Sequence, residues 1–150
     1  MTVHDLQDYL HEHIPMSKAM QVTVVRADED SVVLGAPLAP NINHRATVFG
    51  GSAAAVAILA AWSLLHRRLR SAGISRRLVI QRHSMSFELP IAGAFTARAF
   101  IAPPAAWQQF MRMLERKNRA RITVSVVLEQ GGNAVAHLVG AFVAMDARDA

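Results

Sequence analysis

The sequence predicts an α+β fold in which a long apolar helix is covered by a curved antiparallel β-sheet. The most apolar run, Ala53–Leu65, is interrupted only by Ser63 and has the composition of a buried helix. Alternating apolar residues after this run predict several consecutive strands, which favour antiparallel pairing. A chain of 150 residues fits one domain, residues 1–150, and a sheet that curls around the helix is the simplest way to bury it.

The N-terminal segment predicts a short helix and two strands. Thr2 and Asp5 have the spacing of a capping box, and the helix is expected to continue to about His13, with Pro15 closing it. Alternating apolar residues on both sides of the polar turn "ADED" then predict two strands. These strands span Met20–Arg26 and Ser31–Leu38.

The long helix is expected from Ser52 to about Ala72. Alanine and leucine are strong helix formers, Ser52 is a suitable N-cap, and Gly73 stands where a C-terminal glycine cap belongs. Arginines cluster in its last turns, where the helix dipole favours positive charge.

The second half of the chain predicts four strands and a small inserted helix. The helix begins after the Pro103–Pro104 pair, where apolar residues from Trp107 to Leu114 have helical spacing. The motif "QGGN" predicts a hairpin between the last two strands. The strands are Arg77–Leu89, with Val79, Met85, Phe87 and Leu89 expected on one face, then Ala94–Ile101, Arg119–Glu129 and Asn133–Met145.

Composition narrows the classes of function. The 52% hydrophobic content suits either a membrane segment or a subunit interface, but the longest apolar run is shorter than the roughly 20 residues of a spanning helix. We therefore expect an oligomer and no membrane association.

The absence of cysteine excludes disulfides, thiolate catalysis and cysteine-bound metals. No signal peptide is recognisable, which fits a location in the cytoplasm. The net charge of +5 comes without a nucleic-acid-binding motif, so no nucleic-acid partner is expected. The histidines are scattered, so we expect neither a metal nor a cofactor.

The motif "NINHRATVFGGS", which leads into the long helix, is the strongest candidate site. Gly50 and Gly51 open the helix, where backbone amides lack internal partners and the dipole is positive. Such amides can stabilise an oxyanion, and glycines allow a ligand to approach closely. The alternative is that the glycines only permit a tight turn. Ser52 does not lie in a nucleophile-elbow motif, so its amide rather than its hydroxyl is the candidate group.

Asn43 and His44 are the polar side chains of interest in this motif. Histidine can accept a proton from water near neutral pH, and asparagine can orient a water or hold a carbonyl. Both side chains could instead brace a partly buried loop, and Asn41 could be an ordinary turn residue.

The stretch "APLAPNINHRATVFGGS" resembles the signature of the YiiD C-terminal-type thioesterases, and "FELPIAGAF", "WQQFMRMLERKNRARITVSV" and "LVGAFVAM" extend the resemblance over nearly the whole chain. The resemblance implies a hotdog fold that forms a homodimer, or a dimer of dimers, by joining two sheets edge to edge. It also implies hydrolysis of acyl-CoA or acyl-carrier-protein thioesters at the subunit interface, and the spacing of Asn43 to the glycines matches related phenylacetyl-CoA thioesterases. Two positions depart from the wider pattern: Phe49 replaces a histidine, and Ile58 replaces an acidic residue of the helix.

These features predict thioester hydrolysis and leave two other functions open. Asn43 and His44 are expected to activate water while the amides of Gly51 and Ser52 polarise the thioester; Glu88 or His83 are other possible bases. A non-catalytic acyl-binding module and a dehydratase of the same fold remain open. Arginines suit the phosphates of CoA, although each could equally belong to a charged rim. The residues expected to contact the substrate are Asn41, Phe49, Gly50, Arg76, Arg77, His83 and Arg119.

Overall fold

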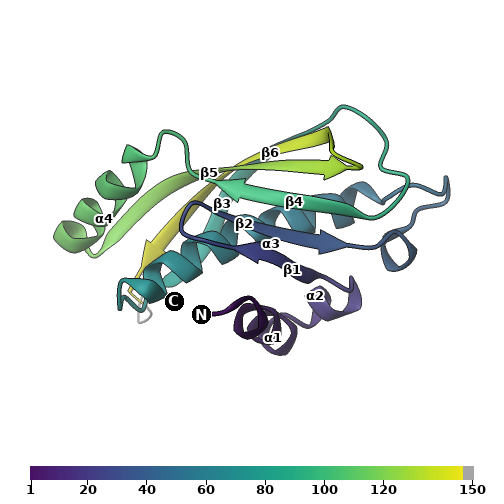
Figure 1. The fold of residues 1–150 in the computed structure, drawn as a ribbon. Coiled ribbons are helices and arrows are strands. Elements are labelled where there is room, and N and C mark those ends of the chain that lie inside the picture. The colour runs from purple at the N-terminus through teal and green to yellow at the C-terminus, as the bar shows by residue number, and fades with distance from the viewer. Residues whose placement is uncertain (147–150) are drawn as a thin grey trace.

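The structure, a computed structural model, describes residues 1–146. Its elements follow the predicted order of a helix, two strands, a long helix and four strands with an inserted helix (Figure 1). The helices are α1 (Val3–His13), α2 (Pro15–Ala19), the 3-10 turn η1 (Ala39–Asn41), α3 (Gly50–Ser71) and α4 (Ala105–Lys117). The strands are β1 (Thr23–Ala27), β2 (Ser31–Ala36), β3 (Arg77–Phe87), β4 (Phe95–Phe100), β5 (Arg119–Gln130) and β6 (Asn133–Met145).

The strands form one antiparallel sheet in the order β1-β2-β4-β5-β6-β3, and α3 runs along one face of it (Figure 1). The core lies between α3 and this face. It includes Val56 and Leu64 of α3, Val124 of β5, and Leu138 and Phe142 of β6, each at most 1% exposed. The α+β fold with a curved antiparallel sheet around a long helix is confirmed.

Helix α3 is longer at its start than predicted. Its N-cap is Phe49, whose side chain makes no capping hydrogen bond, so the expectation that Ser52 caps the helix is wrong. Gly50 and Gly51 belong to the first turn, and Ser52 follows them inside the helix. The C-terminus agrees with the prediction, because Gly73 has a left-handed φ of 72° directly after the cap residue Ala72. No helix in residues 1–146 has both the length and the apolar character needed to cross a membrane.

Helix α1 covers one edge of the sheet. The capping box of Thr2 and Asp5 is present, as predicted. Gln7 Oε1 accepts a hydrogen bond of 2.9 Å from the backbone N–H of Val24, and His11 Nε2 lies 2.7 Å from the Val22 carbonyl oxygen. Side chains of α1 thereby supply hydrogen-bond partners to backbone groups at the free edge of the sheet, next to β1. Pro15 was expected only to end α1, but it also begins α2, since proline suits the first turn of a helix.

Strand β3 forms the other edge, and most of its residues are exposed. A register shift between Ile80 and Arg82 marks a β-bulge at this strand. Val79 pairs with Val143 and Met85 with Leu138, which lie on opposite faces of β6. The expectation that Val79 shares a face with Met85 and Phe87 is therefore wrong, because the extra residue of the bulge reverses the alternation.

Helix α4 lies beside the first half of β5, at the end of the molecule where α3 finishes (Figure 1). Phe110 and Leu114 are buried on its inner side. The Arg68 guanidinium of α3 lies 5.1 Å from the ring centroid of Trp107, which joins the two helices. Desolvation by burial lowers the pKa of Arg68.

Candidate functional site

The loop between η1 and α3 is held by Asn41. This side chain is 2% exposed, and its Nδ2 donates to the carbonyl oxygens of Met20 at 3.0 Å and Pro37 at 2.8 Å. Its backbone carbonyl accepts from Phe49 N–H at 2.8 Å, the residue that caps α3. Asn41 therefore links the segment before β1, the segment after β2 and the start of α3. Its Oδ1 is buried and has no hydrogen-bond partner.

Asn43 organises the turn that projects from this loop. Its Oδ1 accepts from the backbone N–H groups of Arg45 at 2.8 Å and Thr47 at 3.2 Å. Its Nδ2 donates to Thr47 Oγ1 at 2.9 Å. The turn includes Ala46 at a left-handed φ of 61°, which a non-glycine residue adopts only when its surroundings hold it there. Both the oxygen and the nitrogen of the Asn43 side-chain amide thus form hydrogen bonds within the turn.

His44 lies in this turn and is exposed. No hydrogen bond joins its ring to another residue within 1–146. A β-bridge between Ile42 and Val48 closes the base of the turn. The bridge separates the His44 turn from Gly50 along the chain, and no hydrogen bond in residues 1–146 links His44 to the first turn of α3.

The first turn of α3 presents free amide groups. The first backbone bond at this end runs from Ala53 N–H to the Phe49 carbonyl at 3.1 Å. The N–H groups of Gly50, Gly51 and Ser52 have no acceptor among the described residues, as is normal for the start of a helix. Gly51 is exposed, and Gly50 and Ser52 are half-buried, so the first turn of α3 lies at the surface of the chain.

Two phenylalanines flank this helix start. A Cβ atom on Gly51 would lie 2.4 Å from Phe49 Cε2, and one on Gly50 would lie 3.6 Å from Phe87 Cζ. Gly51 therefore lacks a side chain where the ring of Phe49 packs, a reason the sequence did not reveal. Phe49 and Phe87 are themselves 57% and 56% exposed, which leaves an apolar surface beside the free amides.

A histidine–carboxylate pair was missed from the sequence. Glu88 Oε1 lies 2.6 Å from His137 Nδ1, although 49 positions separate the two residues. Only the register of β3 against β6 could have shown it, since Ser86 pairs with His137. Phe87 pairs instead with the buried Ala136. By alternation His137 lies on the face of the sheet that points away from α3.

His83 lies on the other face. It pairs with Gly140, and the bulge gives it the same facing as Phe87, toward α3. Four residues of strand put about 13 Å between them. Without the bulge this histidine would have pointed away from the helix.

The predicted substrate arginines lie far from the helix start in the same chain. Arg77 pairs with Met145, which also pairs with Arg119, so these residues share the end of the sheet opposite Phe87. Ten strand residues from Arg77 to Phe87 amount to about 33 Å. The arginines and the amides of Gly50–Ser52 therefore do not form one site within a single chain.

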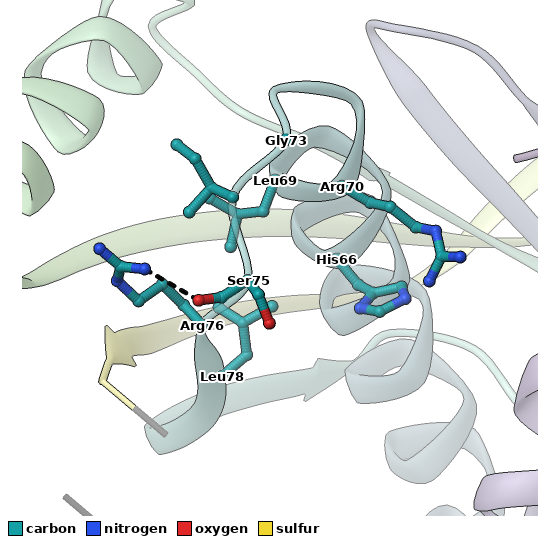
Figure 2. Close-up of a pocket in the computed structure, with 8 residues that line it drawn as sticks. His66, Leu69, Arg70, Gly73, Ser75, Arg76 and Leu78 are labelled. Atoms are coloured by element: carbon teal, nitrogen blue, oxygen red, sulfur yellow. Dashed lines mark hydrogen bonds between the residues drawn. The ribbon is translucent and has the colours of Figure 1, made fainter. Parts of the chain in front are cut away.

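Several cavities lie at the end of the sheet that carries Arg77 and Arg119, including one of about 600 Å³ between Arg76 and helix α4. A second, of about 240 Å³, lies between the end of α3 and the start of β3 and includes His66, Arg70 and Arg76 (Figure 2). A third, of about 740 Å³, is a groove between α4 and the sheet that includes Arg119 and Arg121. Within the described chain, no group of three or more potential ligands for a metal ion is found.

Known proteins resemble this chain over nearly its whole length. Residues 3–146 match the YiiD_C family, described as "Putative thioesterase (yiiD_Cterm)". A protein of unknown function from Chlorobaculum tepidum TLS is 25% identical, with a TM-score of 0.89 over 96% of this chain and 94% of that one. A "putative thioesterase" from Shewanella oneidensis is 23% identical, with a TM-score of 0.85 over 95% and 96%. The Haemophilus influenzae thioesterase HI1161 is 11% identical, with a TM-score of 0.79 over 97% and 92%.

The two thioesterase structures share the fold of this chain, and the family match supports thioester hydrolysis as its class of reaction. The chain belongs to the YiiD_C thioesterase family and has the hotdog fold.

Proposed function

We propose that the protein hydrolyses acyl thioesters carried by CoA or by an acyl carrier protein, at the start of α3. The observation that supports this most directly is the set of unpartnered amides of Gly50, Gly51 and Ser52, in the surface-lying first turn at the positive end of a long helix. The exposed rings of Phe49 and Phe87 beside them suit an acyl chain. Together they offer an oxyanion site next to an apolar surface.

The reaction places the thioester carbonyl oxygen against the N–H groups of Gly51 and Ser52. Water attacks the carbonyl carbon and its proton passes to a base, while negative charge develops on the oxygen and is stabilised by these amides. The tetrahedral intermediate expels the thiolate, which takes the proton back from the base. We assign the base to His44, whose exposed ring has no hydrogen-bond partner in residues 1–146. Asn43, whose amide is engaged within the turn, holds that turn in position.

We propose a homodimer through β3. An exposed edge strand offers unpaired backbone groups and is normally covered or blunted. The β1 edge has Gln7 and His11 of α1 against it, whereas β3 has nothing beyond it in the described chain. A two-fold axis near the middle of β3 would pair the strand with its copy. It would also cover apolar surface around Phe49 and Phe87.

This pairing would complete the site. Because the paired strands run in opposite directions, the Arg77 end of one chain would lie beside the Phe87 end of the other. The arginines that lie about 33 Å from the helix start in one chain would approach the helix start of the partner. The substrate would thus contact both chains. Its acyl thioester would lie at the start of α3 in one chain, and its carrier would lie near the arginine-bearing end of the sheet in the other.

A thiol-release assay over a series of acyl-CoA lengths, repeated with acyl-carrier-protein thioesters, tests the proposal. We expect turnover with at least one acyl length by dimeric protein. Folded, dimeric protein that releases no thiol from any of these substrates would contradict it.

A second candidate is an acyl-CoA binding module without catalysis. The observation that favours it is that no acidic residue occurs from Ser31 to Phe87, so α3 supplies no carboxylate base beside its first amides. It predicts that acyl-CoA binds without hydrolysis and that His44→Ala changes nothing. A large loss of kcat in His44→Ala with binding intact supports the enzyme instead.

A further inference from the structure

The cavity of about 240 Å³ at the end of α3 combines cationic and polar groups with the apolar side chains of Leu69, Ile74 and Leu78. It is bounded on α3 by His66, Leu69 and Arg70, and on the segment that follows by Gly73, Ser75 and Arg76. His66 and Arg70 lie on the helix side, and Arg76 lies across the connecting segment with its Nη1 bonded to the Ser75 carbonyl at 2.9 Å (Figure 2). A water takes about 30 Å³ of liquid volume, so the cavity has room for a phosphate group and several waters.

Buried nitrogen atoms without partners gather here. His66 and Arg76 both line the cavity, and His66 Nε2 and Arg76 Nε are buried without a hydrogen-bond partner among the described residues. Buried polar atoms are nearly always paired, so a cluster of unpaired ones calls for an occupant. Arg76 Nε is a donor, and His66 Nε2 is a donor in one tautomer of the ring, so these groups suit a ligand that carries several acceptor oxygens.

The charge of the cavity has one sign. Its lining contains no acidic residue, and Arg70 makes no ion pair or hydrogen bond with any residue in 1–146. On its other side Arg70 borders the acidic face of α1, with Asp5, Asp8 and Glu12, but none of these carboxylates comes within salt-bridge distance. Arg70 thus lies between the cavity and these carboxylates, and its guanidinium has no ion-pair partner within residues 1–146.

We propose that this cavity is a phosphate subsite, formed by Arg70 and His66 with Ser75, and that it holds a phosphate of the substrate bound at the other protomer's helix start. This rests on the proposed function and the β3 dimer. Within one chain, twenty helix residues put Arg70 about 30 Å from Gly50, too far for one site. In the antiparallel pair the end of α3 in one chain lies beside the start of α3 in the other. The subsite belongs to Arg70 and His66 rather than to Arg119, which lines the separate groove along α4.

Kinetics with and without phosphates test the subsite. Acyl-CoA and the matching acyl-pantetheine thioester carry the same reacting group, but only the first has nucleotide phosphates. Arg70→Gln should raise KM for acyl-CoA about 10- to 100-fold and leave acyl-pantetheine unchanged, because one charge-assisted contact is lost. The control is Arg116→Gln, the same change at an exposed position of α4 outside the cavity, which should leave both KM values as in the wild type.

Mixed dimers test whether the subsite serves the other chain. Gly51→Pro removes one amide of the helix start, and Arg70→Glu reverses the charge of the subsite. If each site combines the two chains, a mixed dimer contains one site with both defects and one intact site, so mixing the two variants restores activity. If both groups act within one chain, no site is intact and mixing restores nothing.

Calorimetry separates this inference from the hydrolase proposal. CoA should bind more weakly to Arg70→Gln than to Arg116→Gln, whether or not any thioester is cleaved. Inorganic phosphate or ADP should compete with CoA in the wild type and not in Arg70→Gln, which would show that the cavity recognises phosphate itself. The inference is overturned if Arg70→Gln and Arg116→Gln give the same KM and the same CoA affinity, or if mixing fails to restore activity.

Discussion

The ring of Phe49 occupies the space that a side chain on Gly51 would need. An ideal Cβ atom on Gly51 would stand 2.4 Å from Phe49 Cε2 and 3.0 Å from Cζ, both at the far end of an exposed ring. The packing of Phe49, the N-cap residue, thus explains why a glycine occupies position 51. The ring covers the Cα side of Gly51, next to the first amides of the helix.

This contact predicts coupling between the two positions. Alanine is favoured over glycine in a helix by about 1 kcal/mol, but in Gly51→Ala the displaced Phe49 ring offsets that gain. In a Phe49→Ala background the same change should stabilise the protein by about 1 kcal/mol, since the obstacle is gone. A double-mutant cycle by urea denaturation measures the difference, and strictly additive effects would contradict the contact.

Asn43 should prove a structural support of its turn. Asn43→Ala removes the bonds to the Arg45 and Thr47 backbone and should cost about 1–3 kcal/mol of stability. Asn43→Asp keeps the accepting Oδ1 and loses only the donor, so its loss should be smaller. Thermal unfolding gives the ranking, and an Asn43→Ala protein as stable as the wild type would rule out this role.

The β3 edge should be protected in solution. Hydrogen exchange of the amides in residues 77–87 should be slow in concentrated protein, where the dimer dominates, including those that point away from β6. On dilution these outward amides should exchange quickly while those bonded to β6 stay slow. Fast exchange of the outward amides at every concentration would exclude pairing through this edge.

His66 should make stability depend on pH. Burial lowers the pKa of His66 from its ordinary value of 6.5, and the charges of Arg70 and His13 lower it further. Tyr9 and Trp62 stack on its ring. The unfolded chain takes up this proton at a higher pH than the folded one, so stability falls as pH drops from above 6.5 through the folded pKa.

The variant His66→Phe keeps an aromatic ring in the stack but cannot take up a proton. Its melting temperature should fall less than that of the wild type between about pH 7.5 and pH 5.5. An identical fall in both proteins would show that the protonation of His66 does not contribute.

The order of the elements could be predicted because each has a local signal. The capping box at Thr2, the left-handed Gly73 and the "QGGN" hairpin are determined by a few neighbouring residues, and all three are present. The start of α3 was placed two residues late, because serine is a frequent N-cap and two glycines argue against helix. Packing of Phe49 and Phe87 against those glycines outweighs that preference.

The spatial grouping of the candidate residues could not be read from the sequence. A single bulge near Gln81 decides that His83 faces α3, and no residue pattern announces it. The Glu88–His137 pair and the distance of Arg77 and Arg119 from the helix start follow from strand register, which is a long-range property. The sequence showed the positive charge of these arginines. It did not show that they lie at the end of the sheet opposite the start of α3.

The most direct test of the oxyanion site compares Gly51→Pro with Gly51→Ala. Both add a Cβ atom against the Phe49 ring, but only proline removes the backbone N–H, and proline is tolerated in the first turn of a helix. If the Gly51 amide stabilises the transition state, kcat of Gly51→Pro should fall about 100- to 1000-fold below that of Gly51→Ala. Equal kcat values for the two folded variants would contradict the account.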